Sequence, residues 1–314
     1  MTDLLDRRLL FVTGKGGVGK TTIAAGLALL AAQQGKRTLV AEIDAKGNLA
    51  DFYETGPTAF RPREVAPNLF AMSMDTEESL KEYLSLQLRL PLVAKIGPLA
   101  RTFDFVANAA PGVKEILTVG KLCWEVKERA YDLVVVDAVA TGHITGQLAA
   151  PTAIKELVQV GLVREQTGWM LDILGDPDQT GVVIVAAPEE MPVNETLELV
   201  DRLADETVVD LAAVVANRVL PELFGRGEEE VFERLLELPD DVLDEAAGGP
   251  ARPILEGAQM AVSLRRTRSA HLARLRDELP PGTPILYVPY LFQRSHGARA
   301  TAQVAAHLGE ELGF

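Results

Sequence analysis

The chain has 314 residues, 47% of them apolar, enough to build the core of one large α/β domain or two small ones. Its net charge of −14 disfavours nucleic acid and anionic membrane surfaces as partners. The single cysteine, Cys123, excludes an internal disulfide and a cysteine-pair metal site within one chain. Its apolar runs are too short to span a bilayer, and residues 1–8 do not resemble a signal peptide. We therefore expect a cytoplasmic protein without stable membrane insertion.

Short strand-like runs alternate with helical segments along most of the chain. The runs lie at residues 9–13, 38–43, 69–74, 132–136, 181–186, 211–216 and 285–288. Several are unbroken runs of valine, leucine and isoleucine, which are typical of strands covered on both faces. This pattern predicts an α/β fold with a doubly wound, mostly parallel sheet, in which ligands bind at the carboxyl ends of the strands.

Two helix-rich stretches, residues 76–129 and 150–175, interrupt this alternation. We expect them to form a helical subdomain inserted into a single domain that spans residues 1–314. Their apolar side chains either pack the subdomain's own core or line a groove for a protein client. The side chains concerned are Leu84, Leu86, Leu88, Leu90, Leu92, Phe103, Phe105, Leu117 and Trp124. Residues 240–253 are rich in proline, glycine and acidic side chains, which predicts a loop or linker.

A phosphate-binding loop (P-loop) follows the first expected strand. It matches the spacing GxxxxGK[ST] between a strand and a helix, and its glycines let backbone N–H groups cradle an anion. Lys20 is expected to reach the β- and γ-phosphates of ATP, and the Thr21 hydroxyl to ligate Mg²⁺. A glycine-rich turn that binds nothing is the alternative. Nucleotide contacts are expected from Gly14, Gly16, Gly17, Val18, Gly19, Lys20, Thr21 and Thr22.

Two aspartates, Asp44 and Asp137, directly follow expected strands and therefore share the P-loop edge of the sheet. Asp137 suits the binding of Mg²⁺ through water, and Asp44 suits the orientation or deprotonation of an attacking water. Helix capping is an alternative role for either carboxylate. Gly142 suits a γ-phosphate sensor, because a glycine backbone can approach the phosphate and change conformation.

The P-loop and the segments around both aspartates resemble one ATPase family. GKGGVGKTT is similar to the deviant Walker A signature, in which a lysine stands at the position of Lys15. DAVATGH, residues 137–143, resembles the switch II sequence DTAPTGH of the arsenite-pump and tail-anchored-protein-targeting ATPases. Residues 44–51 are similar to that family's switch I, DPAHNLSD.

The resemblance extends over most of residues 9–297. Pro111-Gly112 and Glu115 resemble the family's PGxxE element. Asn217 in the string VANR is similar to an asparagine that recognises adenine, and Pro289 and Leu291 resemble the loop that packs against the base.

The resemblance implies a Mg-ATP-dependent ATPase that works as a dimer, with Lys15 reaching across the interface to the partner's nucleotide. The alternative for Lys15 is an ordinary exposed lysine. The bacterial members to which the chain is most similar overall are often encoded as adjacent non-identical pairs, so the dimer contains either a second copy or a paralogous ATPase. The helical subdomain would carry the protein client.

The chain also departs from the family pattern. Ala45 and Gly47 replace the family's proline and histidine in switch I, and Ala140 replaces the proline of switch II. Hydrolysis is therefore expected to be slow, and a low-turnover regulatory subunit beside a paralogue stays open as a second function. Cys123 alone cannot supply the clustered thiolates of a metalloid site, and the family's dimer-bridging CxxC motif is missing.

Other proteins with the deviant Walker A signature agree less well with the sequence. A plasmid-partition ATPase needs a basic DNA-binding surface, and a division-site ATPase ends in a basic amphipathic helix. Residues 300–314 contain two glutamates and no lysine. A nitrogenase-type iron protein needs two cysteines per chain.

Overall fold

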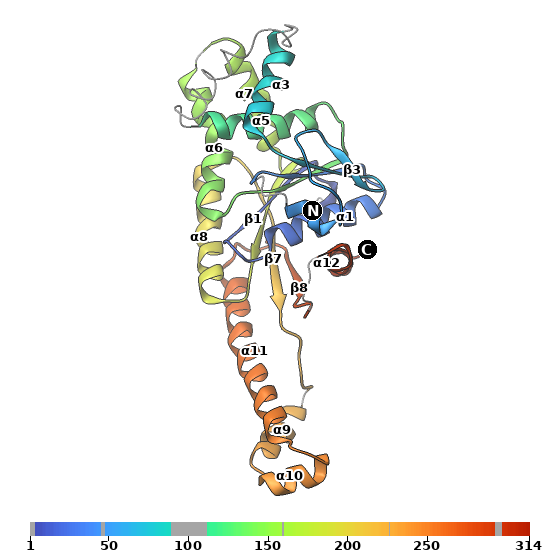
Figure 1. Cartoon of the computed structure of the whole chain (residues 1–314). Helices are drawn as coiled ribbons and strands as arrows, with labels where there is room; N and C mark the ends of the chain where they lie inside the picture. Colours follow the sequence, from blue (N-terminus) through green and yellow to red (C-terminus); the bar gives the residue numbers. More distant parts are fainter. Residues whose placement is uncertain (1–3, 45–47, 89–111, 159, 226, 293–296) are drawn as a thin grey trace.

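The computed structural model describes residues 4–44, 48–88, 112–158, 160–225, 227–292 and 297–314 (Figure 1). Its centre is an eight-stranded sheet with the order β3-β4-β2-β5-β1-β6-β7-β8. The β3–β4 pair is antiparallel, and the other neighbouring pairs of this sheet are parallel. The predicted doubly wound, mostly parallel α/β fold is confirmed. The strands are β1 Leu9–Gly14, β2 Thr38–Glu42, β3 Arg63–Ala66, β4 Leu69–Ser73, β5 Leu133–Asp137, β6 Thr180–Ala186, β7 Leu211–Val219 and β8 Ile285–Pro289.

The strands expected from the sequence are present, with small differences at their ends. Strands β2 and β4 end one residue earlier than expected, before Ile43 and Met74. Strand β5 begins one residue later than expected, after Asp132, and it includes Asp137 as its last residue. Strand β3 was not predicted. Its sequence, REVA, contains no apolar run because it is a half-exposed strand that pairs with β4 at the edge of the described sheet.

Helices cover both faces of the sheet. A hydrophobic core lies on each face, and successive side chains of β1 point alternately into one core and the other. Leu10 and Val12 pack with α1 (Lys20–Gln33) and α12 (Ala298–Leu312). Leu9 and Phe11 pack toward the opposite side, which is covered by α5, α6 and α8. These three helices span Val113–Lys127, Thr141–Leu157 and Glu190–Glu206. The unbroken apolar strands therefore follow from burial on both faces.

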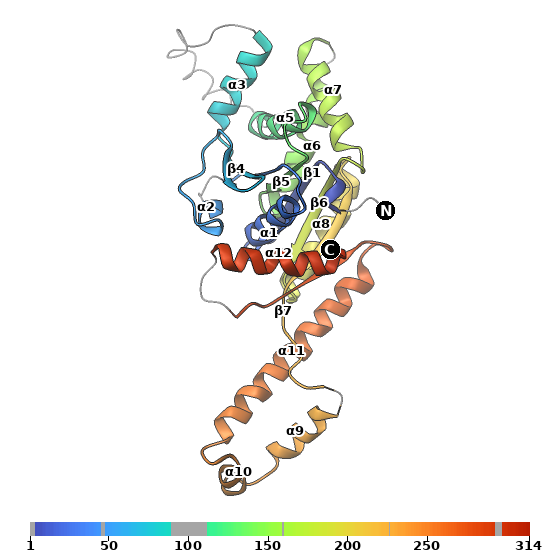
Figure 2. The ribbon, with the colours of Figure 1, turned by 90° about the vertical axis from the view of Figure 1, so that its right-hand side faces the viewer.

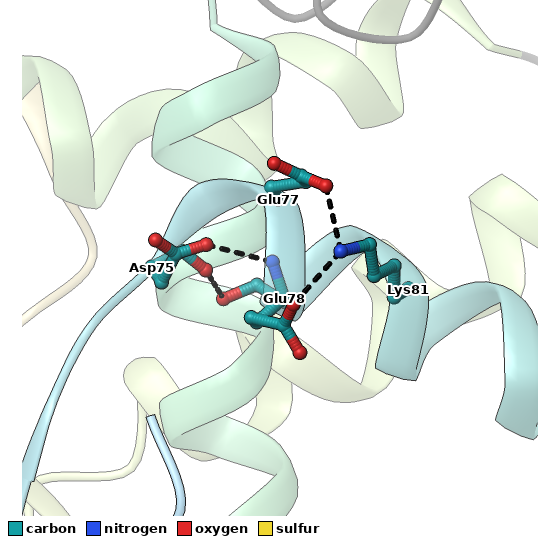
Figure 3. Close-up of polar contacts among 5 residues, drawn as sticks. Asp75, Glu77, Glu78 and Lys81 are labelled. Carbon is teal, nitrogen blue, oxygen red and sulfur yellow. Dashed lines mark hydrogen bonds and ion pairs between the residues drawn. The ribbon is translucent and has the colours of Figure 1, made fainter. Parts of the chain in front are cut away.

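Helices α3 (Thr76–Leu88), α5 and α7 (Leu162–Leu174) pack together at the top of Figure 1. Asp75 caps α3, because its Oδ1 atom accepts a hydrogen bond of 2.8 Å from the backbone N–H of Glu78 (Figure 3). Lys81 forms ion pairs with Glu77 and Glu78 at 2.6 and 2.8 Å in the same turn of the helix.

The proposed limits of the helical subdomain stay a prediction. Helix α6 runs continuously from beside the P-loop into these helices, so residue 150 falls inside a helix. The expected apolar positions at Leu90, Leu92, Phe103 and Phe105, and the family-like Pro111, lie outside the described residues. The same holds for the side chains of Leu84, Leu86 and Leu88.

A second helical projection extends from the opposite end of the molecule (Figures 1 and 2). We call this projection the arm; it consists of α9 (Glu228–Leu236), α10 (Asp240–Ala247) and α11 (Arg252–Glu278). The prediction of a loop at residues 240–253 is wrong. Residues 240–247 form α10, with Pro239 directly before it as the N-cap and Gly248, with φ 70°, as the C-cap.

The arm is held by polar contacts at both ends. Arg252 donates to Asp240 at 2.6 Å and to the carbonyl oxygens of Leu236 and Leu238 at 2.9 and 2.6 Å. The other end of α11 packs on α8, where Leu275 is buried and Arg268 pairs with Glu189 at 3.1 Å.

Two short elements complete the described chain, the 3₁₀ helix η1 (Leu4–Asp6) and helix α2 (Asn48–Phe52). Within the described ranges, no helix combines the length and the apolar character that a membrane span requires.

Candidate functional site: the P-loop edge of the sheet

The P-loop connects β1 to α1 through backbone conformations that favour glycine. Gly14, Gly17 and Gly19 have φ values of 150°, 84° and 98°. A Cβ atom at Gly14 would lie 2.2 Å from the carbonyl oxygen of Val185, and one at Gly19 would lie 2.4 Å from the Asn217 amide nitrogen. The loop thus passes too close to β6 and β7 for a side chain at either glycine, and it ends at the N-terminus of α1, where free backbone N–H groups attract anions.

A cavity of about 370 Å³ opens over this loop. Residues from three parts of the chain surround it: the P-loop and first turn of α1, helix α2, and the end of β7. They are Gly17, Gly19, Lys20, Thr21, Thr22, Asp51, Phe52 and Arg218. Five of the eight residues expected to contact the nucleotide therefore line a cavity, whereas Gly14, Gly16 and Val18 do not line it. Arg218, which follows Asn217 in the string VANR, was not predicted as a site residue, although its place in that string was a signal.

Asp137 lies beside the P-loop with a geometry that suits a hard cation. The Thr21 hydroxyl donates a hydrogen bond of 2.7 Å to Asp137 Oδ2, whereas Asp137 Oδ1 is buried and accepts no hydrogen bond from any residue that the structure describes. A buried carboxylate oxygen without a partner is uncommon, and oxygen ligands are those that Mg²⁺ prefers. Thr21 and Asp137 therefore fit the Mg²⁺ that the fold implies.

The pKa of Asp137 is raised from 3.8 to about 6, mainly because burial penalises the charged carboxylate. The hydrogen bond from Thr21 and the charge of Lys20 lower this pKa, and the charges of Glu42 and Asp44 raise it. Asp137 is thus mostly ionised at pH 7 but titrates close to neutrality.

Asp44 follows β2 at the same edge of the sheet. Its side chain is exposed, and its charge acts on Asp137 strongly enough to raise the pKa of that carboxyl. The backbone N–H of Ile43 donates to the Asp137 carbonyl at 3.1 Å, which holds the two strand ends together. The substituted switch I residues Ala45 and Gly47 lie outside the described residues.

The segment after Asp137 is held against the end of β1. The Thr13 hydroxyl donates to the carbonyl of Val139 at 2.7 Å, and Ala138 N–H donates to the carbonyl of Val12 at 3.0 Å. Gly142 lies in the first turn of α6, exposed, and a Cβ atom there would meet nothing within 4 Å. Packing within the described part of the chain therefore does not require a glycine at this position, and the role of Gly142 as a γ-phosphate sensor stays a prediction.

The family model described as anion-transporting ATPase matches residues 7–171 and 162–246. The chain belongs to this family. ATPase BagA of Mycobacterium tuberculosis is 32% identical over 225 residues, which cover 68% of this chain and 66% of that protein. The matched region is thus slightly less than two thirds of that relative's length.

Two further relatives carry more specific names. A putative arsenical pump-driving ATPase of Halobacterium salinarum is 32% identical over 237 residues, covering 70% of this chain and 37% of that protein. ATPase GET3 of Podospora anserina is 27% identical over 260 residues, covering 70% of this chain and 76% of that protein. The arsenite-pump and tail-anchored-targeting resemblance is therefore confirmed at the level of the family.

In this family member, Lys15 and Lys20 lie in different surroundings. Lys20 Nζ donates to the Lys15 carbonyl at 3.4 Å, within the P-loop. Lys15 Nζ is 2.5 Å from Glu195 Oε1 on α8, and Thr141 Oγ1 donates to Glu195 Oε2 at 3.1 Å. Glu195 was not predicted, because it stands in the middle of a helix, outside the strings that resemble the family.

The adenine-contact residues expected from the sequence lie at the same edge of the sheet. Asn217 is 5% exposed; its Nδ2 donates to the Val18 carbonyl at 2.8 Å and its Oδ1 accepts from Arg218 N–H at 2.9 Å. Asn217 thus ties β7 to the P-loop. Pro289 ends β8 and Leu291 packs against the α1–α12 core. Their contact with adenine stays a prediction.

Proposed function

We propose that this chain binds Mg-ATP and hydrolyses it to ADP and phosphate in the cytosol, and that hydrolysis switches a dimer between open and closed states. The observation that carries the proposal is the pairing of Thr21 with Asp137 beside the P-loop, with the second oxygen of Asp137 buried and partnerless. A structural aspartate would use both oxygens, whereas an aspartate that serves a cation keeps one available.

The chain's own residues supply most of the chemistry. P-loop N–H groups and Lys20 bind the β- and γ-phosphate oxygens and neutralise charge that develops on them. Thr21 and Asp137 hold Mg²⁺, which supplies further positive charge when bound. Asp44 orients a water for in-line attack on the γ-phosphorus, and the bond from phosphorus to the bridging oxygen of ADP breaks. The partner's Lys15 adds charge from across the dimer.

The first test is steady-state ATP hydrolysis by the wild type and Asp44→Asn. We expect kcat to fall at least about 100-fold, with ATP affinity within about threefold, because Asp44 acts on the water rather than on the nucleotide. Asp172→Asn, an exposed aspartate on α7, is the matched control and should hydrolyse ATP normally. An Asp44→Asn variant with full turnover removes Asp44 from the mechanism, and a wild type that does not bind ATP contradicts the whole proposal.

A second function, a low-turnover regulatory subunit that acts beside a paralogous ATPase, is supported by the substitutions at Ala45, Gly47 and Ala140. Sedimentation with and without Mg-ATP measures whether the chain dimerises with itself. Tight ATP binding, no turnover alone and turnover restored by a paralogue would favour this second function.

We also propose that α3, α5 and α7 bind an apolar segment of a protein client. They enclose, with α6, a cavity of about 260 Å³ whose walls include Trp124, Trp169 and Met170. A cavity of this size accepts apolar side chains but not a whole helix. Both tryptophans of the chain line it, with ring centroids 6.2 Å apart, so their fluorescence reports on occupancy.

The client proposal is tested by titrating a 20-residue apolar helical peptide with and without Mg-ATP. We expect a saturable change in tryptophan emission and a weaker response in Leu117→Asp, which places a charge on the cavity wall. A scrambled polar peptide is the control. Equal emission changes with both peptides would argue against a client site here.

A further inference from the structure

Glu195 joins the P-loop to the start of helix α6. Its Oε1 atom binds Lys15 of the P-loop at 2.5 Å and its Oε2 atom accepts from Thr141, the first residue of α6, at 3.1 Å. Both oxygens are thus engaged within one chain. The side chains of Lys15 and Glu195 are each 28% exposed, so the pair is only partly screened by water.

The position of Glu195 is fixed by its helix. Val193, Thr196 and Leu199 are buried on the same segment of α8 and anchor it to the sheet, while Glu195 points from this anchored helix toward the P-loop. A carboxylate fixed in this way holds the Lys15 ammonium better than one on a mobile loop, because little side-chain entropy is lost on pairing. Glu198, one turn further along α8, is exposed, and within the part of the chain that the structure describes it forms no hydrogen bond or ion pair with Lys15 or Thr141.

We propose that Glu195 is a positioning residue that retains Lys15 within its own subunit until ATP draws the start of α6 toward the γ-phosphate. Movement of Thr141 then removes the hydrogen bond that holds the Glu195 carboxylate, and Lys15 becomes available to the triphosphate of the other subunit. Release of Lys15 is in this way made conditional on ATP in its own site. This inference rests on the proposed ATP-dependent dimer.

The direct test is the reactivity of Lys15 in the nucleotide-free chain. Acetic anhydride labelling is followed by mass spectrometry in the wild type, Glu195→Gln and the control Glu198→Gln. We expect Glu195→Gln to label Lys15 at least about threefold faster, because the neutral amide holds the ammonium less tightly. Glu195→Asp, which keeps the charge, should fall between the two. Equal labelling of Lys15 in wild type and Glu195→Gln overturns the proposal, whether or not the chain dimerises.

The release step is tested by the concentration of Mg-AMP-PNP that gives half-maximal dimer in sedimentation. Loss of a partly exposed, charge-assisted pair changes an equilibrium constant by about threefold to tenfold, so Glu195→Gln should lower this concentration by that factor. Glu198→Gln should match the wild type. In a Lys15→Met background, Glu195→Gln should have no further effect, since the proposed coupling acts through Lys15.

Two results would overturn the release step. A higher half-maximal concentration in Glu195→Gln would mean that Glu195 stabilises the closed dimer instead, and an undiminished effect in the Lys15→Met background would mean that Glu195 acts through another residue. Nucleotide binding is measured separately by calorimetry. A wild type that binds no nucleotide contradicts the proposed function, whereas one that binds but never dimerises overturns release alone.

Discussion

Replacement of Asp137 by asparagine should stabilise the nucleotide-free protein while it removes the response to magnesium. The carboxylate is buried, and its pKa is raised from 3.8 to about 6. This difference means that the ionised form costs the folded state about 3 kcal/mol at pH 7. Asparagine has nearly the same shape and no charge, so it removes that cost.

The Thr21 hydroxyl donates to Asp137 Oδ2 at 2.7 Å and lowers the pKa of Asp137, so the raised pKa already includes the effect of this hydrogen bond. We therefore expect Asp137→Asn to be more stable than the wild type by up to about 3 kcal/mol at pH 7. For a chain of this size that corresponds to a rise of up to about 5 °C in Tm.

The gain should depend on pH with a defined sign. Below about pH 4 the Asp137 carboxyl is protonated in both the folded and the unfolded chain, so wild type and variant differ little. Between about pH 4 and 6 the folded chain retains the proton that the unfolded chain has lost, and wild-type stability falls as pH rises. The difference between the proteins should thus grow over this window and level off above it.

The assay is thermal unfolding of both proteins between pH 4 and 8, with and without Mg-AMP-PNP. Nucleotide with magnesium should raise the wild-type Tm and leave the Tm of Asp137→Asn nearly unchanged. The other carboxylates titrate alike in both proteins, so their contribution to stability cancels when the two Tm values are compared at the same pH. A variant that is less stable than the wild type at pH 7, or a gain independent of pH, would refute the reasoning from burial.

Three further substitutions test the packing around the site and the two helical projections. Gly14→Ala should abolish ATP binding in calorimetry and lower the Tm, because its Cβ atom would lie 2.2 Å from a carbonyl oxygen of β6; normal binding would contradict the steric argument. Lys121→Met should destabilise the chain by about 3–5 kcal/mol in urea unfolding, because it leaves two carboxylates, 2.7 and 2.6 Å from the Lys121 ammonium, without their cation. The exposed Lys81→Met is its control and should unfold like the wild type. Arg252→Ala should speed amide hydrogen exchange in α9 and α10 without changing exchange in α1, since Arg252 joins the arm helices to one another. An equal increase of the exchange rate in α1 would show that the arm is not a separate unit of stability.

The sheet and the phosphate-binding site could be predicted because their signals are local. A strand buried on both faces has to be continuously apolar, as in the run Leu133 to Val136, and an anion cradle needs glycines at fixed spacing. The aspartates at the ends of β2 and β5 then follow from the geometry of a parallel sheet.

What was missed depends on distant contacts. Glu195 gains its place from Lys15, 180 residues away in the chain, and no spacing rule connects them. Residues 240–253 were mistaken for a loop because proline and glycine are common in loops, whereas here Pro239 and Gly248 cap a helix of eight residues. Strand β3 forms by pairing with β4, and because it is an exposed edge strand its sequence lacks the apolar run by which the other strands were predicted.

Helix α11 links α8, which packs beside the P-loop, to the far end of the arm. Its base packs on α8, the helix that carries Glu195, and its other end carries α9 and α10. A helix of 27 residues is about 40 Å long, so a tilt of about 5° at the base displaces the far end by about 3 Å. Any rotation of α8 would therefore be magnified along the arm, and the displacement of its far end would be large enough to measure between spin labels.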